Sequence, residues 1–580
     1  MNGWHGRLLH VDLSSGVCRY EAIPASWLQS YLGGRGLGVR LLRETYHLDP
    51  FAPEMPLVFA CGPLGGTSAP TSSRLAVVSR SPLTGTIYDC SAGGRFAHRL
   101  KGAGIDALVI TGQSAQPTLL RLSPAGATLE PAQKLWGERF HATAAALQSA
   151  SESVAAIGPA GERGVLFANI MMGEGNSVGR GGLGAVMGNK RLKAIVVSGD
   201  QRPTIADPER LQKGRQDVMR LFKASPILFG QLGIAEYGTP TLVDLMTQRR
   251  MAPTENFRRT VFEAAANYSG PAIRKAYQSK KDGCFGCPIQ CKKSTPQGEH
   301  LPEYETVSHF GALNGIADLH SIVKSNTLCN DLGMDTISAA ATLSAWGELR
   351  GRFPSADEVQ KLLLAMALRQ GEGESLALGS QRLTRAAGRP EFSMSVKGLE
   401  LPAYDPRGAY GMALAYCTSN RGGCHLRAYP ISHEILRKPV PTDRFSFAGK
   451  ARIIKIAEDT NATIDSLVAC KFSFLGASLE EYGTILSGVT GHDYSPQDLK
   501  EIGERIYLTE RYYNLANGFS EKDDTLPPRF FSEAGSSGEG IDVPPIDQAR
   551  FNEERRKYYR IRGLTDDGSF KDPAWLGGQP

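Results

Sequence analysis

The sequence predicts an α+β protein: a β-rich N-terminal domain with two sheets and glycine-rich cofactor loops, followed by two mainly α-helical domains. Three observations lead to this fold class. Short apolar runs separated by glycine clusters fill roughly the first two hundred residues, helical spacing of apolar residues begins after Pro203, and 580 residues suffice for two to four domains. We expect the domains to cover residues 1–203, 204–394 and 395–580.

The N-terminal domain begins with a predicted β-hairpin. Residues 8–13 and 17–23 alternate between apolar and polar types around Ser14-Ser15-Gly16, which is a turn sequence. Residues 57–60, 76–78, 107–110 and 194–197 are short apolar runs typical of buried strands. A second hairpin is expected over residues 118–122 and 127–129. These segments supply the strands of two sheets.

Four glycine-rich stretches separate these strands, at residues 33–38, 62–66, 91–94 and 179–184. Glycine lets a backbone approach a ligand closely and present N–H groups to anions, so we expect loops that hold a large phosphate-bearing cofactor. Tight turns without a ligand are the alternative. Residues 179–184 also fit G-x-G-x-x-G, but no strand runs directly into them, as a dinucleotide site would require.

Beyond Pro203 the pattern is helical. Helices are expected over residues 208–223, 337–349 and 356–368, where apolar residues recur at helical spacing. Ser355, with Glu358 three positions later, forms the capping-box signature for the last of these. The remainder is predicted to be mainly helical with long loops.

Charge and composition exclude several classes of protein. The net charge of +6 is spread along the chain without a dense basic run, so a nucleic-acid partner is not expected. No apolar run approaches the length of a membrane span, and the start lacks the apolar stretch of a secretory leader. With ten cysteines in such a chain, we expect a cytoplasmic protein with reduced thiols.

Three of these cysteines lie within eight residues. Cys284, Cys287 and Cys291 form C-x2-C-x3-C between lysine pairs, a pattern that suits three ligands of a cubane iron–sulfur cluster. Zinc is the alternative, although a zinc ribbon would show a second C-x2-C soon afterwards and none follows. Spacing alone leaves the fourth ligand open among four cysteines: Cys329, Cys417, Cys424 and Cys470.

Several stretches in the same order resemble the tungsten-containing aldehyde:ferredoxin oxidoreductase family over nearly the whole chain. They are the cysteine loop, residues 330–335 (Asn-Asp-Leu-Gly-Met-Asp), residues 465–470 (Asp-Ser-Leu-Val-Ala-Cys), residues 79–85 and residues 179–188. In that family, two D-x-x-G-L-(D/C) motifs hold two pyranopterins, and the last cysteine of the second motif completes a 4Fe–4S cluster. The resemblance therefore implies Cys470 as the fourth cluster ligand.

The resemblance further implies a tungsten (or molybdenum) ion held by two pyranopterins, whose phosphates share a magnesium ion. It places Arg74 between cluster and pterin, and the Ser91 and Gly181 carbonyls toward the magnesium, which prefers oxygen ligands. The implied cofactor-binding residues are Arg74, Ser91, Gly93, Arg180, Gly181, Leu183, Asn330, Asp335, Arg427, Asp465 and Lys471. Carboxylates would accept from the pterin rings, while arginines and backbone N–H groups would bind phosphate. For residues 179–184, this pterin-phosphate interpretation replaces the dinucleotide-binding one.

The family's active-site glutamate and histidine correspond to Glu305 and His425, with Glu303 as the other candidate base. The implied reaction is oxidation of an aldehyde to a carboxylic acid, in which a carboxylate takes a proton and an imidazole polarises the carbonyl. Electrons would leave through the cluster to ferredoxin or to a dedicated iron–sulfur subunit. A tungsten subunit of an aryl-CoA reductase and a non-catalytic electron-transfer subunit are the alternatives.

The sequence departs from the family pattern at three points. Asn330 stands where the first motif can have aspartate, and Val468-Ala469 replaces Gly-Leu in the second. An E-x-x-H pair, which binds a bridging iron in some members, is absent after Pro203. Residues 44–47 and 138–141 have this spacing, but they lie in the N-terminal domain and are expected to be incidental matches. We therefore do not expect a metal-bridged dimer, although an oligomer or heteromeric complex remains the expectation.

Overall fold

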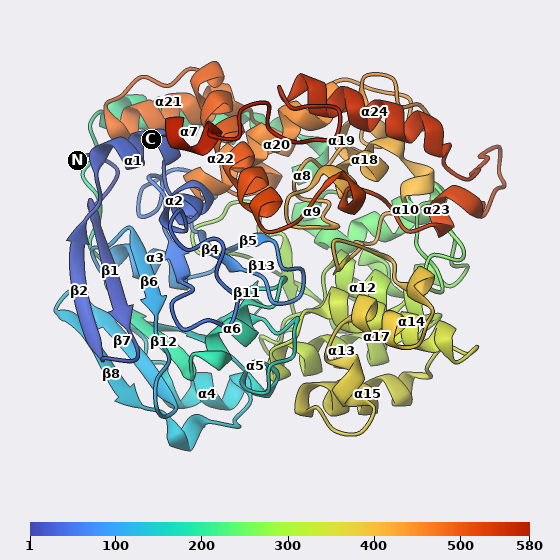
Figure 1. Cartoon of the computed structure of the whole chain (residues 1–580), viewed down its shortest axis with the longest axis horizontal. Coiled ribbons are helices and arrows are strands. Elements are labelled where there is room, and N and C mark those ends of the chain that lie inside the picture. Colours follow the sequence, from blue (N-terminus) through green and yellow to red (C-terminus); the bar gives the residue numbers. More distant parts are fainter. Residues whose placement is uncertain (174, 580) are drawn as a thin grey trace.

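A computed structural model describes residues 1–173 and 175–579 of the chain. Two six-stranded mixed sheets form its N-terminal part, and the remainder is largely helical (Figure 1), which confirms the predicted fold class. The strands of the first sheet are β1 (Arg7–Asp12), β2 (Val17–Ala22), β3 (Leu57–Ala60), β4 (Leu75–Arg80), β5 (Ile87–Ala92) and β6 (Ala107–Thr111). Those of the second are β7 (Thr118–Ser123), β8 (Gly126–Pro131), β9 (Glu152–Ala156), β10 (Ile170–Met172), β11 (Ser177–Val178) and β12 (Leu192–Ser198).

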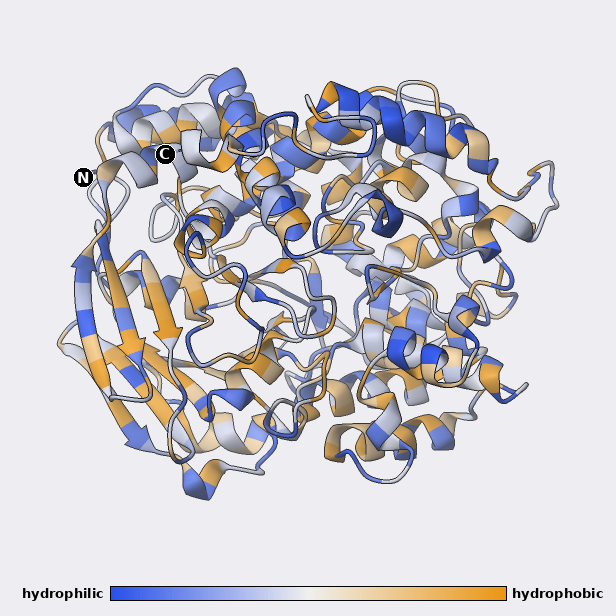
Figure 2. Ribbon diagram, in the orientation of Figure 1, coloured by the Kyte–Doolittle hydropathy of each residue, from blue (hydrophilic) through white to orange (hydrophobic). Residues whose placement is uncertain are grey.

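Each sheet contains one of the predicted hairpins. The first sheet has the order β2-β1-β6-β3-β4-β5, with β1 antiparallel to β2 and parallel to β6. The second has the order β11-β10-β9-β12-β7-β8, with β7 antiparallel to β8 and parallel to β12. The predicted strands thus form, and the short apolar runs prove to be central strands buried on both faces. In Figure 2 most strands are accordingly orange.

Helices α1 to α6 belong to this part of the chain: α1 (Ala25–Tyr31), α2 (Gly34–Leu41), α3 (Phe96–Gly102), α4 (Phe140–Leu147), α5 (Pro159–Glu162) and α6 (Leu183–Asn189). The glycine stretch at residues 33–38 was expected to be a loop, and that expectation is wrong, because α2 begins inside it. A Cβ on Gly34 would lie 2.2 Å from the Asp465 carbonyl oxygen, and one on Gly38 would lie 2.3 Å from a Val78 methyl group. The glycines therefore allow a helix to pack against neighbouring backbone and strand.

The middle of the chain follows the predicted helices closely. It contains α7 (Pro208–Ala224), α8 (Pro226–Phe229), α9 (Ile234–Tyr237), α10 (Leu242–Gln248), α11 (Gly270–Tyr277), α12 (Tyr304–Phe310), α13 (Leu319–Leu332), α14 (Thr336–Leu349), α15 (Ala356–Leu368), α16 (Gly373–Leu376) and α17 (Ser380–Ala386). A two-stranded ribbon, β13 (Lys280–Asp282) and β14 (Lys292–Ser294), carries the cysteine loop, and β15 (Ser395–Val396) pairs with β16 (Leu399–Glu400). Ser355 and Glu358 form the predicted capping box of α15.

The last third of the chain contains α18 (Tyr410–Thr418), α19 (Ile431–Glu434), α20 (Lys450–Leu467), α21 (Leu479–Thr490), α22 (Pro496–Ala516), α23 (Arg529–Ser532) and α24 (Gln548–Ile561). Helix α20 packs against α22 and α2, so the C-terminal helices return to the N-terminal sheet (Figure 1). Helix α7 packs against α21, so helices from either side of residue 394 share one layer. The division into three domains stays a prediction.

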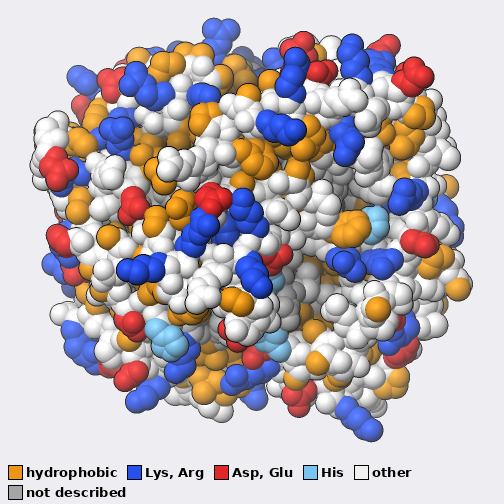
Figure 3. Space-filling model, turned by 180° about the vertical axis from the view of Figure 1, so that it is seen from behind, with side chains coloured by type: hydrophobic (Ala, Val, Ile, Leu, Met, Phe, Trp, Pro, Cys, Tyr) orange, Lys and Arg blue, Asp and Glu red, His pale blue; other side chains and the backbone are white. Residues whose placement is uncertain are grey.

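The surface agrees with the even charge distribution of the sequence. On the face in Figure 3, basic and acidic side chains are interspersed among apolar and uncharged ones. Throughout the described residues, no helix is both long enough and apolar enough to cross a membrane.

Candidate active site

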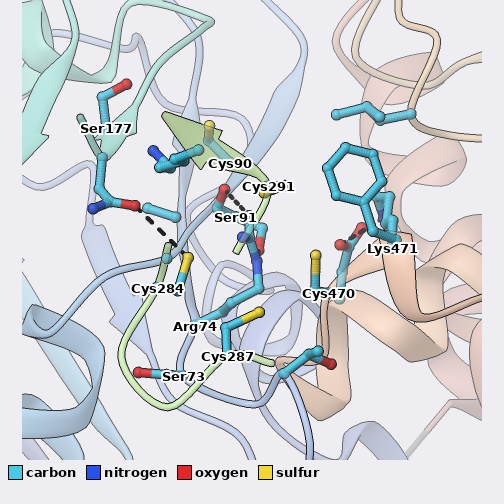
Figure 4. Close-up of a pocket in the computed structure, with 18 of the residues that line it drawn as sticks. Ser73, Arg74, Cys90, Ser91, Ser177, Cys284, Cys287, Cys291, Cys470 and Lys471 are labelled. Carbon is cyan, nitrogen blue, oxygen red and sulfur yellow. Dashed lines mark hydrogen bonds and ion pairs between the residues drawn. The ribbon is translucent and has the colours of Figure 1, made fainter. Parts of the chain in front are cut away.

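Four cysteine side chains from two distant parts of the chain line one cavity. Cys284, Cys287 and Cys291 come from the loop between β13 and β14, and Cys470 follows α20. All four are free thiols. Figure 4 shows their sulfur atoms around one shared space. Folding therefore brings Cys470 to the three cysteines of the loop, as a four-thiol site requires.

The spread of these thiols bears on which metal they suit. Among the described residues, no three His, Cys, Asp or Glu side chains gather tightly enough to hold a single ion. A structural zinc ion needs its sulfur ligands at about 2.3 Å. A cubane cluster distributes its four thiolates over four iron atoms, so the ligands stand farther apart. Four thiols lining one cavity are compatible with a cluster, whose ligands need not converge on a single ion.

Arg74 lies among the thiols. Its Nε donates to Ser91 Oγ at 2.9 Å and its Nη2 donates to the Ser91 carbonyl at 2.8 Å, which fixes the guanidinium. Burial opposes its charge, but the fields of Cys470, Cys284 and Asp465 raise the pKa of Arg74. One cation therefore interacts with both the thiol group and the second-motif carboxylate, as the predicted bridging role requires.

Gly93 leaves no room for a side chain beside this cation. A Cβ at this position would lie 2.3 Å from Cys284 Sγ and 3.1 Å from Arg74 Nη1. The backbone following β5 thus packs directly against the thiol group. Such a close approach is a feature of sites where a backbone encloses a ligand.

The second motif lies at the end of α20. Val468 ends this helix in the left-handed conformation (φ 59°), which a glycine would adopt without strain. The turn needed after Asp465 is therefore formed despite the valine. Lys471 Nζ lies 2.6 Å from Asp465 Oδ1, and Arg427 Nη1 donates to Oδ2 at 3.2 Å. One short segment thus carries a paired carboxylate and the thiol of Cys470.

A buried ion-pair network, which no sequence pattern indicates, supports this segment. Arg35 forms a two-point contact with Glu510, at 2.6 and 2.7 Å, and lies 3.6 Å from Asp465 Oδ2. Asp89 pairs with Arg427, and its pKa lies well below the usual range because this arginine and Arg35 outweigh the effect of burial. These partners are hundreds of residues apart, so no local sequence signal identifies them.

The first motif positions Asp335 in a similar way. The preceding helix, α13, ends at Gly333 in the left-handed conformation, and Asp335 caps α14 by accepting from the Ile337 N–H at 3.0 Å. Its other oxygen accepts from Arg180 Nε at 2.9 Å and from Ser338 Oγ at 2.7 Å. Arg180 lines the thiol cavity, and so joins the first motif to it.

Most of the predicted cofactor-binding residues line the thiol cavity, but some lie outside it. Seven of them line it with the four cysteines: Arg74, Ser91, Gly93, Arg180, Arg427, Asp465 and Lys471. Asn330 lines a smaller adjoining hollow, whereas Leu183 is a core residue at the start of α6. The Ser91 carbonyl accepts from Arg74, and the Gly181 carbonyl accepts from Ser81 Oγ at 2.6 Å. A carbonyl has a second lone pair, so both could still face a magnesium ion.

Glu305 and His425 come together although 120 positions separate them in the sequence. Glu305 lies in the first turn of α12 and His425 in the loop after α18, with 3.7 Å between Glu305 Oε1 and His425 Nε2. Glu305 Oε2 accepts from the Ala403 N–H at 2.9 Å. Within the described residues, Glu305 Oε1 and His425 Nδ1 are buried atoms without a hydrogen-bond partner. These two atoms are available for a reactant.

Burial controls the ionisation of this pair. It raises the pKa of Glu305 to about 8, against smaller opposing effects from the Ala403 N–H and Arg180. Burial, followed by the fields of Arg180 and Arg421, lowers the pKa of His425 well below its usual range. Near neutral pH, Glu305 can therefore exchange a proton, while His425 is a neutral ring.

Aromatic rings and a second histidine surround the pair. The ring of Tyr404 lies 5.4 Å from that of His425 and 5.9 Å from that of Tyr429. His309 is fully buried, with Nδ1 2.7 Å from the Glu305 carbonyl and Nε2 3.1 Å from the Leu401 carbonyl. Our sequence reasoning missed His309, although its position four residues after Glu305 on one helix was a usable signal.

The charges around the thiol cavity fit anionic groups. Six cationic and three carboxylate side chains line it: Arg74, Arg180, Lys292, Arg421, Arg427, Lys471, Asp89, Glu303 and Asp465. Arg427 Nε has no hydrogen-bond partner among the described residues. Burial lowers the pKa of Lys471 to about 8, so an added anion would stabilise its charge. The donor set thus fits a thiolate-bound cluster beside phosphate-bearing pterins.

Comparisons with known proteins agree with this architecture. The N-terminal domain of aldehyde ferredoxin oxidoreductase matches residues 8–199. Domains 2 and 3 of aldehyde ferredoxin oxidoreductase match residues 213–574. The two matches together cover most of the chain.

Individual relatives match over nearly their full length. The chain is 38% identical to the tungsten-containing aldehyde ferredoxin oxidoreductase of Pyrococcus furiosus and 39% identical to that of Thermococcus kodakarensis, in each case over 98% of this chain and 97% of the relative. Among solved structures, the active site complex BamBC of benzoyl coenzyme A reductase with 1,5-dienoyl-CoA has a TM-score of 0.84 at 22% identity, covering 98% of this chain and 96% of that one. At that identity the likeness concerns the fold alone.

Proposed function

This chain belongs to the aldehyde ferredoxin oxidoreductase family, and we propose that it oxidises aldehydes to carboxylic acids and passes the electrons to a ferredoxin or a dedicated iron–sulfur subunit. One observation carries the proposal: Glu305 and His425, each with an unpartnered buried atom, approach within 3.7 Å, and the two residues that follow His425 line the cation-rich cavity of four thiols. A proton-accepting pair next to a redox site is what aldehyde oxidation needs.

The cofactors would occupy the cavity. Cys284, Cys287, Cys291 and Cys470 would hold a 4Fe–4S cluster, and the two motif carboxylates with their arginine and lysine partners would hold the pterins. When bound, the tungsten (or molybdenum) centre accepts an electron pair, and the cluster releases electrons singly. The Ser91 and Gly181 carbonyls are the proposed magnesium contacts.

Glu305 would act as the base at Oε1. The Ala403 N–H holds Oε2, so the carboxylate has one defined orientation and one free oxygen. Oxidation adds a water oxygen to the carbonyl carbon and releases two protons and two electrons. Glu305 takes a proton from the water that attacks, while neutral His425 positions the reactant at Nδ1.

The surroundings favour an uncharged aldehyde. The rings near His425 are tyrosines, including Tyr404 and Tyr429. The cations whose fields reach His425 are already engaged: Arg180 with Asp335, Lys471 with Asp465, and Arg421 with the Cys424 sulfur and the Asp89 carbonyl. The proposal assigns Arg180 and Lys471 to the pterins, so these two cations would not be the substrate's partners.

Metal analysis and activity of protein purified without oxygen test the proposal. We expect tungsten or molybdenum with about four irons per chain, and reduction of a viologen dye by simple aldehydes. Reduction of an aryl-CoA ring with no aldehyde activity would favour the aryl-CoA reductase alternative, and iron without tungsten, molybdenum or pterin would favour an electron-transfer subunit. Glu305→Gln and His425→Asn should each lose turnover while retaining the metals. Full turnover in both would refute the assigned roles.

A further inference from the structure

An aromatic ring is exposed at the cluster loop itself. Phe285 follows Cys284 directly, and its side chain is 45% exposed. Its ring packs against that of His98, with 4.5 Å between centroids, and Arg95 Cζ lies 5.4 Å from its centre. The loop thus presents a supported apolar side chain to solvent.

Four arginines without acidic partners lie near Phe285 or His98. Arg95 immediately precedes α3, and Arg99 lies within this helix. Arg202 follows β12, and Arg215 belongs to α7. Throughout the described chain none of the four forms an ion pair, and Arg99 donates only to the Gly199 carbonyl, at 3.1 Å. Their charges are therefore not neutralised by acidic side chains of the described chain.

The acidic groups nearby do not neutralise the patch. Asp200 is exposed and its field on His98 is weaker than those of Arg99, Arg202 and Arg95. Asp282, at the start of the cysteine loop, lies 3.2 Å from the ring of His300 instead. Within the described residues, the surface around Phe285 therefore has more basic than acidic side chains, although the whole chain carries only +6.

A hollow of about 570 Å³ adjoins this surface, and Arg74 lines both this hollow and the thiol cavity. Arg202, Arg215, His98 and Phe285 also line this hollow. Among the described residues around it, none is an aspartate or glutamate. Because Arg74 also lies among the thiols, the hollow marks a place where the cluster site approaches the surface.

We propose that the surface formed by Phe285, His98 and Arg95, Arg99, Arg202 and Arg215 is the docking site for a small acidic iron–sulfur protein. The inference rests on the proposed electron-transfer role of the cluster. An apolar centre within a charged rim is the usual anatomy of a transient interface, and the arginines would attract and orient an acidic partner. One electron passes from the reduced cluster to the oxidised partner, with no bond made or broken.

Two measurements test the docking site separately from aldehyde turnover. Binding of a fluorescently labelled bacterial ferredoxin of net negative charge is followed by anisotropy at several salt concentrations. Its reduction by dithionite-reduced protein, after removal of excess dithionite, is followed by stopped-flow absorbance. The test variant is Arg202→Gln with Arg215→Gln, and the matched control is Arg258→Gln with Arg437→Gln, two exposed arginines also without ion pairs in the described chain.

The test variant should weaken ferredoxin binding and slow electron transfer at least about tenfold at low salt, and should flatten the salt dependence, while viologen reduction stays normal. The control variant should match the wild type. Unchanged ferredoxin binding in the test variant, or an equal loss in the control, would overturn the proposal. Failure of the proposed function would appear differently, as absent aldehyde activity with viologen in the wild type.

Discussion

The pKa of Glu305 predicts how kcat/KM for an aldehyde depends on pH. Its pKa of about 8 leaves about 9% of the carboxyl ionised at pH 7 and about 91% at pH 9. Because the base must be ionised to accept a proton, kcat/KM for an aldehyde should rise about tenfold over this interval. The pKa of His425 is lowered well below its usual range, so this side chain stays neutral over the whole interval. His425 should therefore not add a second inflection to the pH profile of kcat/KM.

The assay is anaerobic viologen reduction from pH 6 to pH 10, on preparations with matched tungsten (or molybdenum) and iron. Glu305→Gln should lose the rising limb and about 10²- to 10⁴-fold in rate. Glu303→Gln is the matched control, because Glu303 lines the thiol cavity and is the other candidate base. A flat wild-type profile, or a limb that disappears in Glu303→Gln and survives in Glu305→Gln, would refute the reasoning.

Three further predictions concern the cavity and its support. Gly93→Ala should reduce the iron content, measured by a colorimetric assay, well below four per chain, because its methyl group would lie 2.3 Å from Cys284 Sγ. Gly577→Ala is the control and should keep its full iron content, because a methyl group there would meet no atom within 4 Å. Cys470→Ser should abolish the wild-type cluster signal in electron paramagnetic resonance of the reduced protein, and an unchanged signal would exclude it as a ligand. His309→Leu should lower the free energy of unfolding by about 1–3 kcal/mol, since a carbonyl bonded to the ring loses its donor; an unchanged denaturant midpoint would contradict this.

The sequence predicted what depends on local chemistry. The hairpin at residues 8–23 follows from alternation around a turn, and the start of α15 follows from Ser355 and Glu358. The glycine stretch at residues 33–38 was misread because glycine is typical both of ligand-binding loops and of close helix packing, and only the position of Asp465 distinguishes them. No local pattern could have shown that packing.

For the candidate active site, too, local sequence patterns identified residues but not the distant contacts that support them. The cysteine spacing and the two motifs identified the residues, but their support depends on contacts such as Arg35 with Glu510, which are 475 positions apart. Charge pairing of this kind leaves no periodic signal in one sequence. His309 is the exception, because it follows Glu305 by one helical turn and this spacing is visible in the sequence.

The walls of the thiol cavity come from five separate parts of the chain, within residues 71–93, 175–180, 284–303, 421–427 and 465–472, and the cavity has more cations than carboxylates. A chain that closes before its cofactors arrive must bury like charges without compensation, which is unfavourable. Groups that bind only the folded state also stabilise it. We therefore expect insertion of the proposed cofactors to be a step in the maturation of the fold.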